Sequence, residues 1–378
     1  MKGFVLPFPS SLEKLMPPGT LKRLLDKKAL SPYTYGDLQI VRIRHDADGV
    51  SRGAVVLPAE LIVHSFPRIK RILHLENGIK RYFKDADFFA EEKIDGYNVR
   101  AVFAEGRLLA FTRGGFVCPF TVDRLPDLIN ISFLKDNPGY VLCGEMAGPE
   151  NPYNTEPVAY IKEDVKFFGF DIMDGGGSLL PADEKTSLFR EYGIEHVRRW
   201  GPFTTRDIPE IREIVSGLNE DGREGLVLKS PSGRGEMVKY VTAGSCLRDV
   251  ESTAGLMAEI PPGYYLQRLW RSIFSAQESG LRADDPFLLR FIKSLYVENL
   301  ELLRCIEKGG SITEDFQIRV TKPQVAEELL LHLKRAGVRA RIISMEKVQG
   351  HWKARIQRTY IKGTRELAGR LKGRGFYD

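Results

Sequence analysis

The hydrophobic pattern of the chain changes near residue 246, and this change constrains the fold more than any other feature. Upstream of it, apolar residues recur at every second position in short segments. Residues 97–103 have the alternation of a half-buried strand, and Glu105-Gly106-Arg107 predicts a turn into a second strand over 108–112. Further strands are predicted at 141–145, 165–173, 225–229 and 237–241.

Downstream of residue 246 the apolar residues recur at three-to-four spacing, which predicts helices. The two clearest segments are residues 265–274 and 287–306. Pro261-Pro262-Gly263 and Asp284-Asp285-Pro286 interrupt the helical pattern. A helical block therefore follows the strand-rich stretch.

Both ends of the chain predict smaller modules. In the first 62 residues, strands are expected at 38–43 and 54–57, with a turn at 46–49 between them. At the other end, residues 311–378 predict strand, helix, strand, strand and helix at 316–320, 323–335, 339–343, 352–357 and 364–371. We therefore expect an α+β protein with four parts, namely 1–62, 63–245, 246–310 and 311–378.

Positive charge is concentrated at the two ends. The net charge is +6, yet residues 1–89 hold 15 Lys+Arg against 9 Asp+Glu, and residues 311–378 hold 15 against 7. The middle of the chain is therefore acidic. Basic ends suggest a polyanionic partner such as a nucleic acid, and a merely solvated basic surface is the alternative.

Several classes of protein are disfavoured. There is no apolar run of about 18 residues and no secretion signal, so we expect a cytoplasmic protein. The four cysteines form no CxxC pair and the six histidines no HExxH, which argues against a zinc site or a disulfide framework. The glycines at 175–177 predict a turn, because no phosphate-loop pattern accompanies them.

The strongest chemical signal is a set of segments in a fixed order. Lys93-Ile94-Asp95-Gly96 is followed by Phe167-Phe168-Gly169-Phe170-Asp171-Ile172, then Glu224-Gly225-Leu226-Val227-Leu228-Lys229, and then Lys239. A K-x-D-G match alone is weak, because four-residue patterns arise by chance. Together, the segments over about 85–245 resemble the covalent nucleotidyltransferases, a superfamily that includes polynucleotide ligases and mRNA capping enzymes.

The resemblance implies that Lys93 takes a nucleotide as a phosphoramidate. A lysine attacks an α-phosphate only as the free amine, and its usual pKa near 10.4 leaves little amine at neutral pH. We expect Lys229, Lys239 and a metal ion to lower this pKa and to hold the triphosphate. Gly96 would let the backbone approach the nucleotide, and Asp95 would orient the lysine or a metal-bound water.

The resemblance also implies roles for five further side chains. Glu224 would bind the divalent metal, Mg²⁺ or Mn²⁺. Phe170 would stack on the adenine of ATP, with Phe168 as the alternative. The remaining expected contacts to the nucleotide come from Arg113, from Glu145 at the ribose or a metal-bound water, and from Glu92 at the adenine amino group.

Asn98 indicates which class within the superfamily the chain resembles most. DNA ligases and capping enzymes generally have arginine five residues after the lysine, whereas K-x-D-G-x-N is similar to RNA ligases, in which the asparagine helps to place the RNA ends. The order of the four parts also resembles the archaeal homodimeric ATP-dependent RNA ligases. This resemblance implies an ATP-grasp-like nucleotidyltransferase core of antiparallel sheets. That resemblance implies a homodimer through residues 246–310.

The implied reaction joins an RNA 5′-phosphate to a 3′-hydroxyl through lysyl-AMP and RNA-adenylate. A capping-type guanylyltransferase and a DNA ligase remain alternatives within the superfamily. A non-catalytic RNA-binding protein with a nucleotide pocket is a third alternative, against which the intact Lys93, Glu224 and Lys239 argue.

Overall fold

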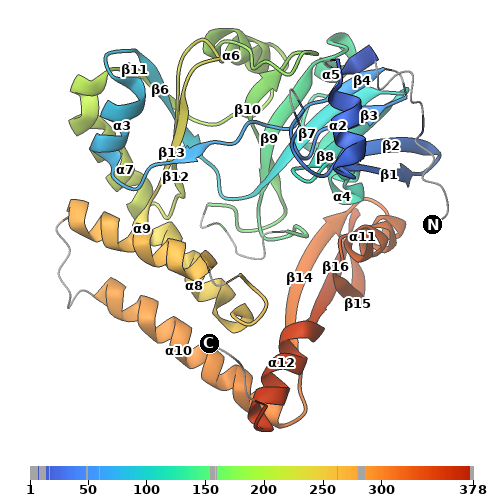
Figure 1. Ribbon diagram of the computed structural model, residues 1–378, viewed down its shortest axis with the longest axis vertical. Coiled ribbons are helices and arrows are strands. Elements are labelled where there is room, and N and C mark those ends of the chain that lie inside the picture. Colours follow the sequence, from blue (N-terminus) through green and yellow to red (C-terminus); the bar gives the residue numbers. More distant parts are fainter. Residues whose placement is uncertain are drawn as a thin grey trace.

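The computed structural model describes residues 7, 14–16, 18–47, 50–58, 60–153, 158, 160–261, 263–279 and 286–374. Helices and four sheets alternate along the chain, so the predicted α+β class is confirmed. In Figure 1 the two large sheets occupy the upper half, and the helical block and the C-terminal sheet lie below them.

Two antiparallel sheets form the centre of the molecule. One has the strand order β10-β9-β7-β8 and the other the order β11-β6-β12-β13-β5, in which only β5 and β13 pair in parallel. The first sheet contains β7 (Tyr97–Ala104), β8 (Arg107–Thr112), β9 (Val141–Ala147) and β10 (Lys166–Met173). The second contains β5 (Lys70–Arg71), β6 (Phe88–Lys93), β11 (Arg199–Phe203), β12 (Gly225–Lys229) and β13 (Met237–Val241).

Helices cover the outer face of each sheet. Phe88, Leu226 and Val238 form a buried cluster with apolar residues of α3 (Leu75–Phe83) and α7 (Ile208–Glu220). On the first sheet the covering helices are α4 (Pro119–Leu128), α5 (Ser132–Asp136) and α6 (Ala182–Glu191), with a short 3₁₀ turn at Thr205–Asp207 before α7. The opposite faces of the two sheets line the cavity described below, and on the first sheet this face also carries the N-terminal sheet.

The N-terminal sheet has the order β1-β2-β3-β4 and packs on one face of the first central sheet, against buried residues of all four of its strands. Its elements are α2 (Thr20–Asp26), β1 (Leu30–Tyr35), β2 (Leu38–Ile43), β3 (Val55–Leu57) and β4 (Leu61–Val63). Arg100 on β7 joins the two parts, because its buried guanidinium donates hydrogen bonds to the carbonyl oxygens of Gly53 at 2.8 Å and His64 at 2.6 Å.

The helical block consists of α8 (Ala243–Thr253), a 3₁₀ turn at Ala254–Leu256, α9 (Gly263–Ser279) and α10 (Pro286–Glu307). Phe291 of α10 is buried against Leu247 and Val250 of α8. Glu278 near the end of α9 accepts hydrogen bonds from the Leu75 backbone N–H and from the Tyr240 hydroxyl, which fixes α9 to the second central sheet.

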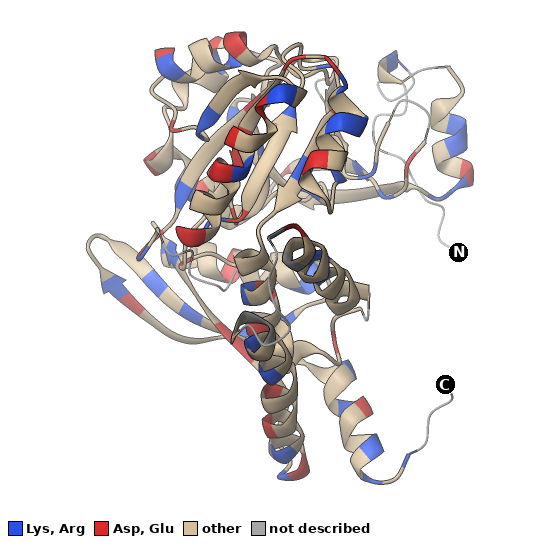
Figure 2. Cartoon of the chain, turned by 90° about the vertical axis from the view of Figure 1, so that its left-hand side faces the viewer, with Lys and Arg blue, Asp and Glu red and all other residues tan. Residues whose placement is uncertain are grey.

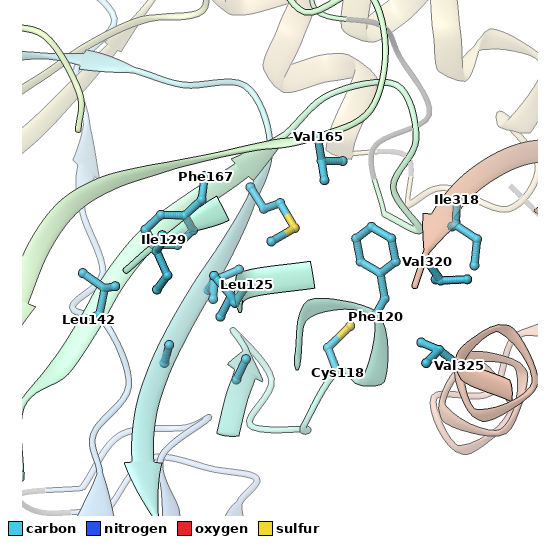
Figure 3. Packing of buried hydrophobic residues seen from close by; sticks show 14 of the residues in the cluster. Cys118, Phe120, Leu125, Ile129, Leu142, Val165, Phe167, Ile318, Val320 and Val325 are labelled. Carbon is cyan, nitrogen blue, oxygen red and sulfur yellow. The ribbon is translucent and has the colours of Figure 1, made fainter. Parts of the chain in front are cut away.

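The C-terminal part is a three-stranded sheet of order β14-β16-β15 with two helices. Its elements are β14 (Ile312–Val320), α11 (Pro323–Arg335), β15 (Arg339–Val348), β16 (His351–Tyr360) and α12 (Ile361–Leu371). Figure 3 shows Ile318, Val320 and Val325 beside Phe120 and Cys118, in one continuous buried cluster with the first central sheet. The C-terminal part therefore shares its core with the rest of the chain.

Most predicted elements are present. Strands 38–43, 225–229 and 237–241 and helix 323–335 have the predicted bounds, and the other predicted strands are found with ends shifted by up to five residues. The structure adds β6, which carries Lys93 and was not predicted, because Glu91-Glu92-Lys93 hides its apolar pattern. Part of the predicted turn at 46–49 and of the breaks at 261–263 and 284–286 lies outside the described residues.

Candidate active site

A cavity of about 400 Å³ opens between the two central sheets. Nine of the eleven predicted site residues line it, namely Glu92, Lys93, Gly96, Asn98, Arg113, Glu145, Phe170, Lys229 and Lys239. The other two, Asp95 and Glu224, are outside the lining, and Glu224 is joined to the cavity by its contact with Lys93. The fold therefore brings the separate sequence segments to one place.

Lys93 ends β6 and Glu224 immediately precedes β12, and the two strands pair with Lys93 opposite Gly225. This register places the Lys93 Nζ 2.5 Å from the Glu224 Oε2. Gly225 has φ of 148°, and a Cβ there would lie 2.2 Å from the Tyr240 carbonyl oxygen. Only glycine fits at this position, so it is needed to set Glu224 against the lysine.

The expected lowering of the Lys93 pKa by neighbouring cations is wrong for this arrangement. Burial alone would lower the pKa, but the carboxylates of Glu224, Glu145 and Asp95 outweigh it and raise the pKa above the ordinary lysine value. Lys93 is therefore held as an ammonium ion, and its conversion to the free amine requires that the influence of Glu224 be weakened.

Glu145 and Asn98 lie opposite one another on the paired strands β9 and β7. Burial, with the nearby charge of Glu224, raises the pKa of Glu145 to about 8, although Lys93 opposes the shift. The Asn98 Oδ1 is buried and has no hydrogen-bond partner within the described part of the chain. An unpaired buried acceptor that lines a cavity is available for a ligand.

Gly96, which lines the cavity, also has a packing role that was not expected. A Cβ at this position would lie 2.3 Å from the carbonyl oxygen of Met146 on the neighbouring strand β9. The glycine is therefore required for close packing of the segment after Lys93 on β9, whatever it does for a nucleotide.

The two phenylalanines of β10 that were candidates for stacking on adenine face different surroundings. Phe168 is buried in a cluster with Ile94 and Val197, whereas Phe170 lines the cavity. Phe66 meets Phe170 edge-on with ring centroids 5.0 Å apart, and it lines the same cavity. Of the two candidates for stacking on adenine, Phe170 is thus the one exposed to the cavity.

Lys229 is already fully engaged with protein groups. Its Nζ lies 2.5 Å from Glu91 Oε2 and 2.7 Å from Asp171 Oδ2. Lys185 of α6 lies 2.7 Å and 2.6 Å from the other oxygens of the same two carboxylates. These four residues form a buried, charge-balanced group, which we call the buried quartet. Lys185 was missed in the sequence, because nothing in its own helix indicates this role.

Glu92 is likewise paired. Its carboxylate accepts hydrogen bonds from Arg198 at 2.7 Å and from Arg223 at 2.6 Å. Tyr160 lies under the Arg223 guanidinium at 3.8 Å. A contact from Glu92 to the adenine amino group would therefore use a carboxylate already held in place by two arginines.

Positive charge faces the Lys93 end of the cavity. Burial lowers the pKa of Lys239 to about 8, and Arg71, Lys93 and Arg113 add to the shift. Arg71 is opposite Lys239 in the β5–β13 pairing, and its buried Nη1 has no hydrogen-bond partner among the described residues. Arg71 is a second residue that the sequence did not reveal; its pairing with Lys239 is visible only in the sheet.

The donor set fits a divalent ion that arrives with phosphates. Within the described ranges, no cluster of three or more His, Cys, Asp or Glu side chains could hold a metal by itself. Mg²⁺ is commonly bound by one or two carboxylates together with substrate phosphates. Glu224 provides such a carboxylate, next to Lys93 and Glu145.

Comparison with known proteins agrees with this geometry. Residues 86–241 match the family described as RNA ligase, and residues 252–374 match the family described as the C-terminal region of ligase Pab1020. A protein of Methanocaldococcus jannaschii of uncharacterized function is 27% identical over 93% of this chain and 92% of its own length.

Solved structures match over nearly the whole chain. A protein of Aquifex aeolicus, provisionally assigned as an ATP-dependent DNA ligase, is 34% identical, covers 96% of this chain and 100% of its own, and has a TM-score of 0.88. Two structures of an archaeal ATP-dependent RNA ligase are 28% identical over 99% of this chain and 100% of theirs, with TM-scores of 0.88 and 0.89. The chain belongs to the ATP-dependent RNA ligase family and is a ligase enzyme.

Proposed function

We propose that the protein joins an RNA 5′-phosphate to a 3′-hydroxyl through AMP carried on Lys93. The observation that carries the proposal is the Lys93–Glu224 contact of 2.5 Å at a cavity that also presents Phe170, Arg113 and Lys239. The cavity offers an aromatic face for a base, cations for phosphates and a lysine at the end of a strand.

In the first step, the Lys93 amine attacks the α-phosphate of ATP, the bond to the β-phosphate breaks and pyrophosphate leaves. Lys239, with Arg71 beside it, holds the negative charge that develops on the leaving phosphates. A divalent ion bound by Glu224 together with ATP would neutralise this carboxylate and so favour the free amine of Lys93.

In the second step, an oxygen of the RNA 5′-phosphate attacks the lysyl-AMP phosphorus, and Lys93 is released as the amine. In the third step, the RNA 3′-hydroxyl attacks the 5′-phosphate phosphorus of the RNA-adenylate and AMP leaves. In this proposal Asn98 accepts a hydrogen bond from a sugar hydroxyl beside the reacting phosphate, because its buried Oδ1 has no partner among the residues that the structure describes.

Labelling with nucleotide tests the first step. The chain incubated with α-labelled ATP and a divalent ion should retain the label, and α-labelled GTP should not label it. Retention of GTP instead would favour a capping-type guanylyltransferase. The absence of label from either nucleotide would favour a binding protein without turnover.

The names of the relatives differ on the nucleic acid, because one structural relative is assigned to DNA and another to RNA. Asn98, at the position where DNA ligases generally have arginine, favours RNA. Labelled enzyme should therefore transfer AMP to a 5′-phosphorylated RNA and seal it, and should act more slowly on DNA of the same sequence. Equal rates on both would remove the preference for RNA.

We also propose a homodimer through the helical block, residues 246–310. Trp270 on α9 is 51% exposed, and on α10 Ile292 is 67% and Tyr296 71% exposed. Phe291 and Tyr265 instead pack on α8 within the same chain, and the side chains of Phe287 and Leu288 lie outside the described residues. Sedimentation should show a dimer at micromolar concentration that Trp270→Glu with Ile292→Glu converts to a monomer.

The domain division at 62, 245 and 310 and the basic C-terminal part as an RNA-binding surface remain part of this proposal. Figure 2 shows Lys and Arg interspersed with Asp and Glu over most of the chain, so the excess at residues 311–378 is spread over several elements.

None of the helices in the described ranges has the length and hydropathy needed to cross a bilayer. The four free cysteines support a reducing, cytoplasmic location.

A further inference from the structure

A second cavity adjoins the nucleotide cavity, between the N-terminal sheet and the first central sheet. Its volume is about 810 Å³, and it shares Phe66, Pro67 and Arg113 with the nucleotide cavity. The remaining wall includes Arg52 and Arg68, which come from the N-terminal part and from the segment that follows β4. The two cavities therefore meet at Arg113, next to the site of nucleotide transfer.

The wall of this second cavity has an excess of positive charge. Arg52, Arg68 and Arg113 line it, against the single carboxylate of Asp46. Arg68 lies 3.0 Å from Asp46, but the side chains are 73% and 51% exposed. A solvent-exposed ion pair of this kind contributes little, so a phosphate can replace the carboxylate at low cost.

A fourth arginine, Arg100, adds positive charge behind the wall of this cavity. Arg100 is fully buried, and its guanidinium donates hydrogen bonds to the carbonyl oxygens of Gly53, His64 and Thr112. Within the described part of the chain no carboxylate pairs with it. Its charge is therefore uncompensated by a neighbouring anion, and it also fixes the backbone that bears Arg52 and the cavity wall.

We propose that this second cavity binds the sugar–phosphate backbone of the 5′-phosphorylated strand, with Arg52 and Arg68 as its phosphate ligands. One guanidinium group can bind two oxygens of a phosphate at once. Three arginines beside an aromatic ring are therefore suited to bind a single strand. The strand's 5′-phosphate then reaches the nucleotide cavity past Arg113. This assignment rests on the proposed ligase function and gives the N-terminal part a role in holding the substrate.

The test separates RNA binding from nucleotide transfer. Arg52→Ala with Arg68→Ala is compared with Arg190→Ala with Arg206→Ala, two exposed arginines elsewhere whose loss changes the net charge equally. Affinity for a 5′-phosphorylated RNA 12-mer is measured by anisotropy across a salt titration, and AMP labelling is measured on the same proteins.

The cavity variant should bind the RNA about tenfold more weakly near 0.1 M salt. The slope of log affinity against log salt concentration should become less steep by about 1.4, since each lost phosphate contact to a single strand contributes about 0.7. Its AMP labelling and the control's RNA binding should match wild type. Arg52→Lys with Arg68→Lys should retain most of the salt slope. DNA of the same sequence should lose affinity equally, because phosphate contacts do not distinguish the sugars.

Three results would overturn the assignment. RNA affinity equal to that of the control would show that the strand does not use this cavity. A loss confined to RNA and absent with DNA would mean that the arginines contact the 2′-hydroxyl groups and are not phosphate ligands. Reduced ATP labelling with intact RNA binding would assign the cavity to the triphosphate. A wild-type chain that takes no label from ATP would instead refute the ligase proposal, while the binding comparison still tests the cavity.

Discussion

The same two strands carry two lysine–carboxylate groups that differ in almost every physical respect. At one end of the β6–β12 pair, Lys93 meets the single carboxylate of Glu224, with side chains 20% and 13% exposed. Glu91 lies two residues before Lys93 on β6, and Lys229 lies four residues after Gly225 on β12. Both belong to the buried quartet, in which no side chain is more than 9% exposed.

The difference separates a reactive group from a structural one. In the buried quartet two ammonium groups and two carboxylates satisfy one another, so neither lysine is free to bind or react. At the cavity, Lys93 has one principal partner, and a ligand that competes for Glu224 changes the state of the lysine. A lysine in the right sequence motif is therefore not sufficient; its partners decide what it can do.

Lys93→Ala gives the largest expected effect. AMP labelling should fall by at least 10³-fold, because no other lysine described at the cavity combines a strand-end position with a single carboxylate partner. The thermal midpoint should stay close to that of wild type, since the site is partly open. Labelling by this variant at more than a few per cent of the wild-type rate would place the nucleophile elsewhere.

Lys185→Met tests the other side of the comparison. Removing one cation from the buried quartet leaves two buried carboxylates with one lysine, which should lower the free energy of unfolding by roughly 3–5 kcal/mol. Lys93→Met is the matched control, and its effect on urea unfolding should be smaller. Equal destabilisation by the two variants would contradict the distinction between a structural and a reactive lysine.

Glu224→Ala should reduce AMP labelling by about 100-fold or more at fixed Mg²⁺, because the carboxylate that meets both lysine and metal is lost. Its removal also takes away a group that raises the pKa of Lys93, so the loss should not come from a scarcer amine. A magnesium titration should not restore the rate. Recovery to wild-type labelling at high Mg²⁺ would limit Glu224 to metal affinity alone.

Asn98→Ala should separate the steps of the reaction. Asn98 lines the cavity and its Oδ1 has no partner in the described ranges, so sealing of preadenylylated RNA should slow about tenfold more than lysine adenylylation does. Single-turnover rates for the two steps provide the measurement. Equal losses in both would make Asn98 a ligand of ATP or a structural residue of β7.

The smallest expected effect concerns pH. Lys239 has a pKa of about 8, so it is charged below that pH and neutral above it. The kcat/KM for ATP in the labelling reaction should therefore fall by about tenfold per unit well above pH 8 as the cation is lost. Lys239→Arg stays charged and should lack this decline. An unchanged decline in that variant would assign the titration to another group.

The C-terminal part shows why deletion is a poor test of charge. Removing residues after 311 would expose the apolar cluster that Ile318 and Val320 share with Phe120, and would break the buried pair of Arg319 with Glu150. Salt dependence of RNA binding is better probed by substituting exposed basic residues such as Arg339.

The sequence by itself determined the elements whose signal is local. Strands such as β12 and β13 and helix α11 have apolar repeats and breakers within their own residues, so their bounds could be predicted. The order of motifs around Lys93, Glu224 and Lys239 identified the chemistry, because the reaction requires these residue types. The strand that bears Lys93 was missed, since its charged residues face a buried partner group rather than water.

Only the tertiary structure decided which charges meet. Lys93 and Glu224 are 131 residues apart, and the partners of Lys229 come from β6 and β10. The same holds for Phe66 beside Phe170 and for Arg71 beside Lys239. Sheet register and burial set these contacts and the pKa values that follow from them, and neither is encoded within any one segment of the chain.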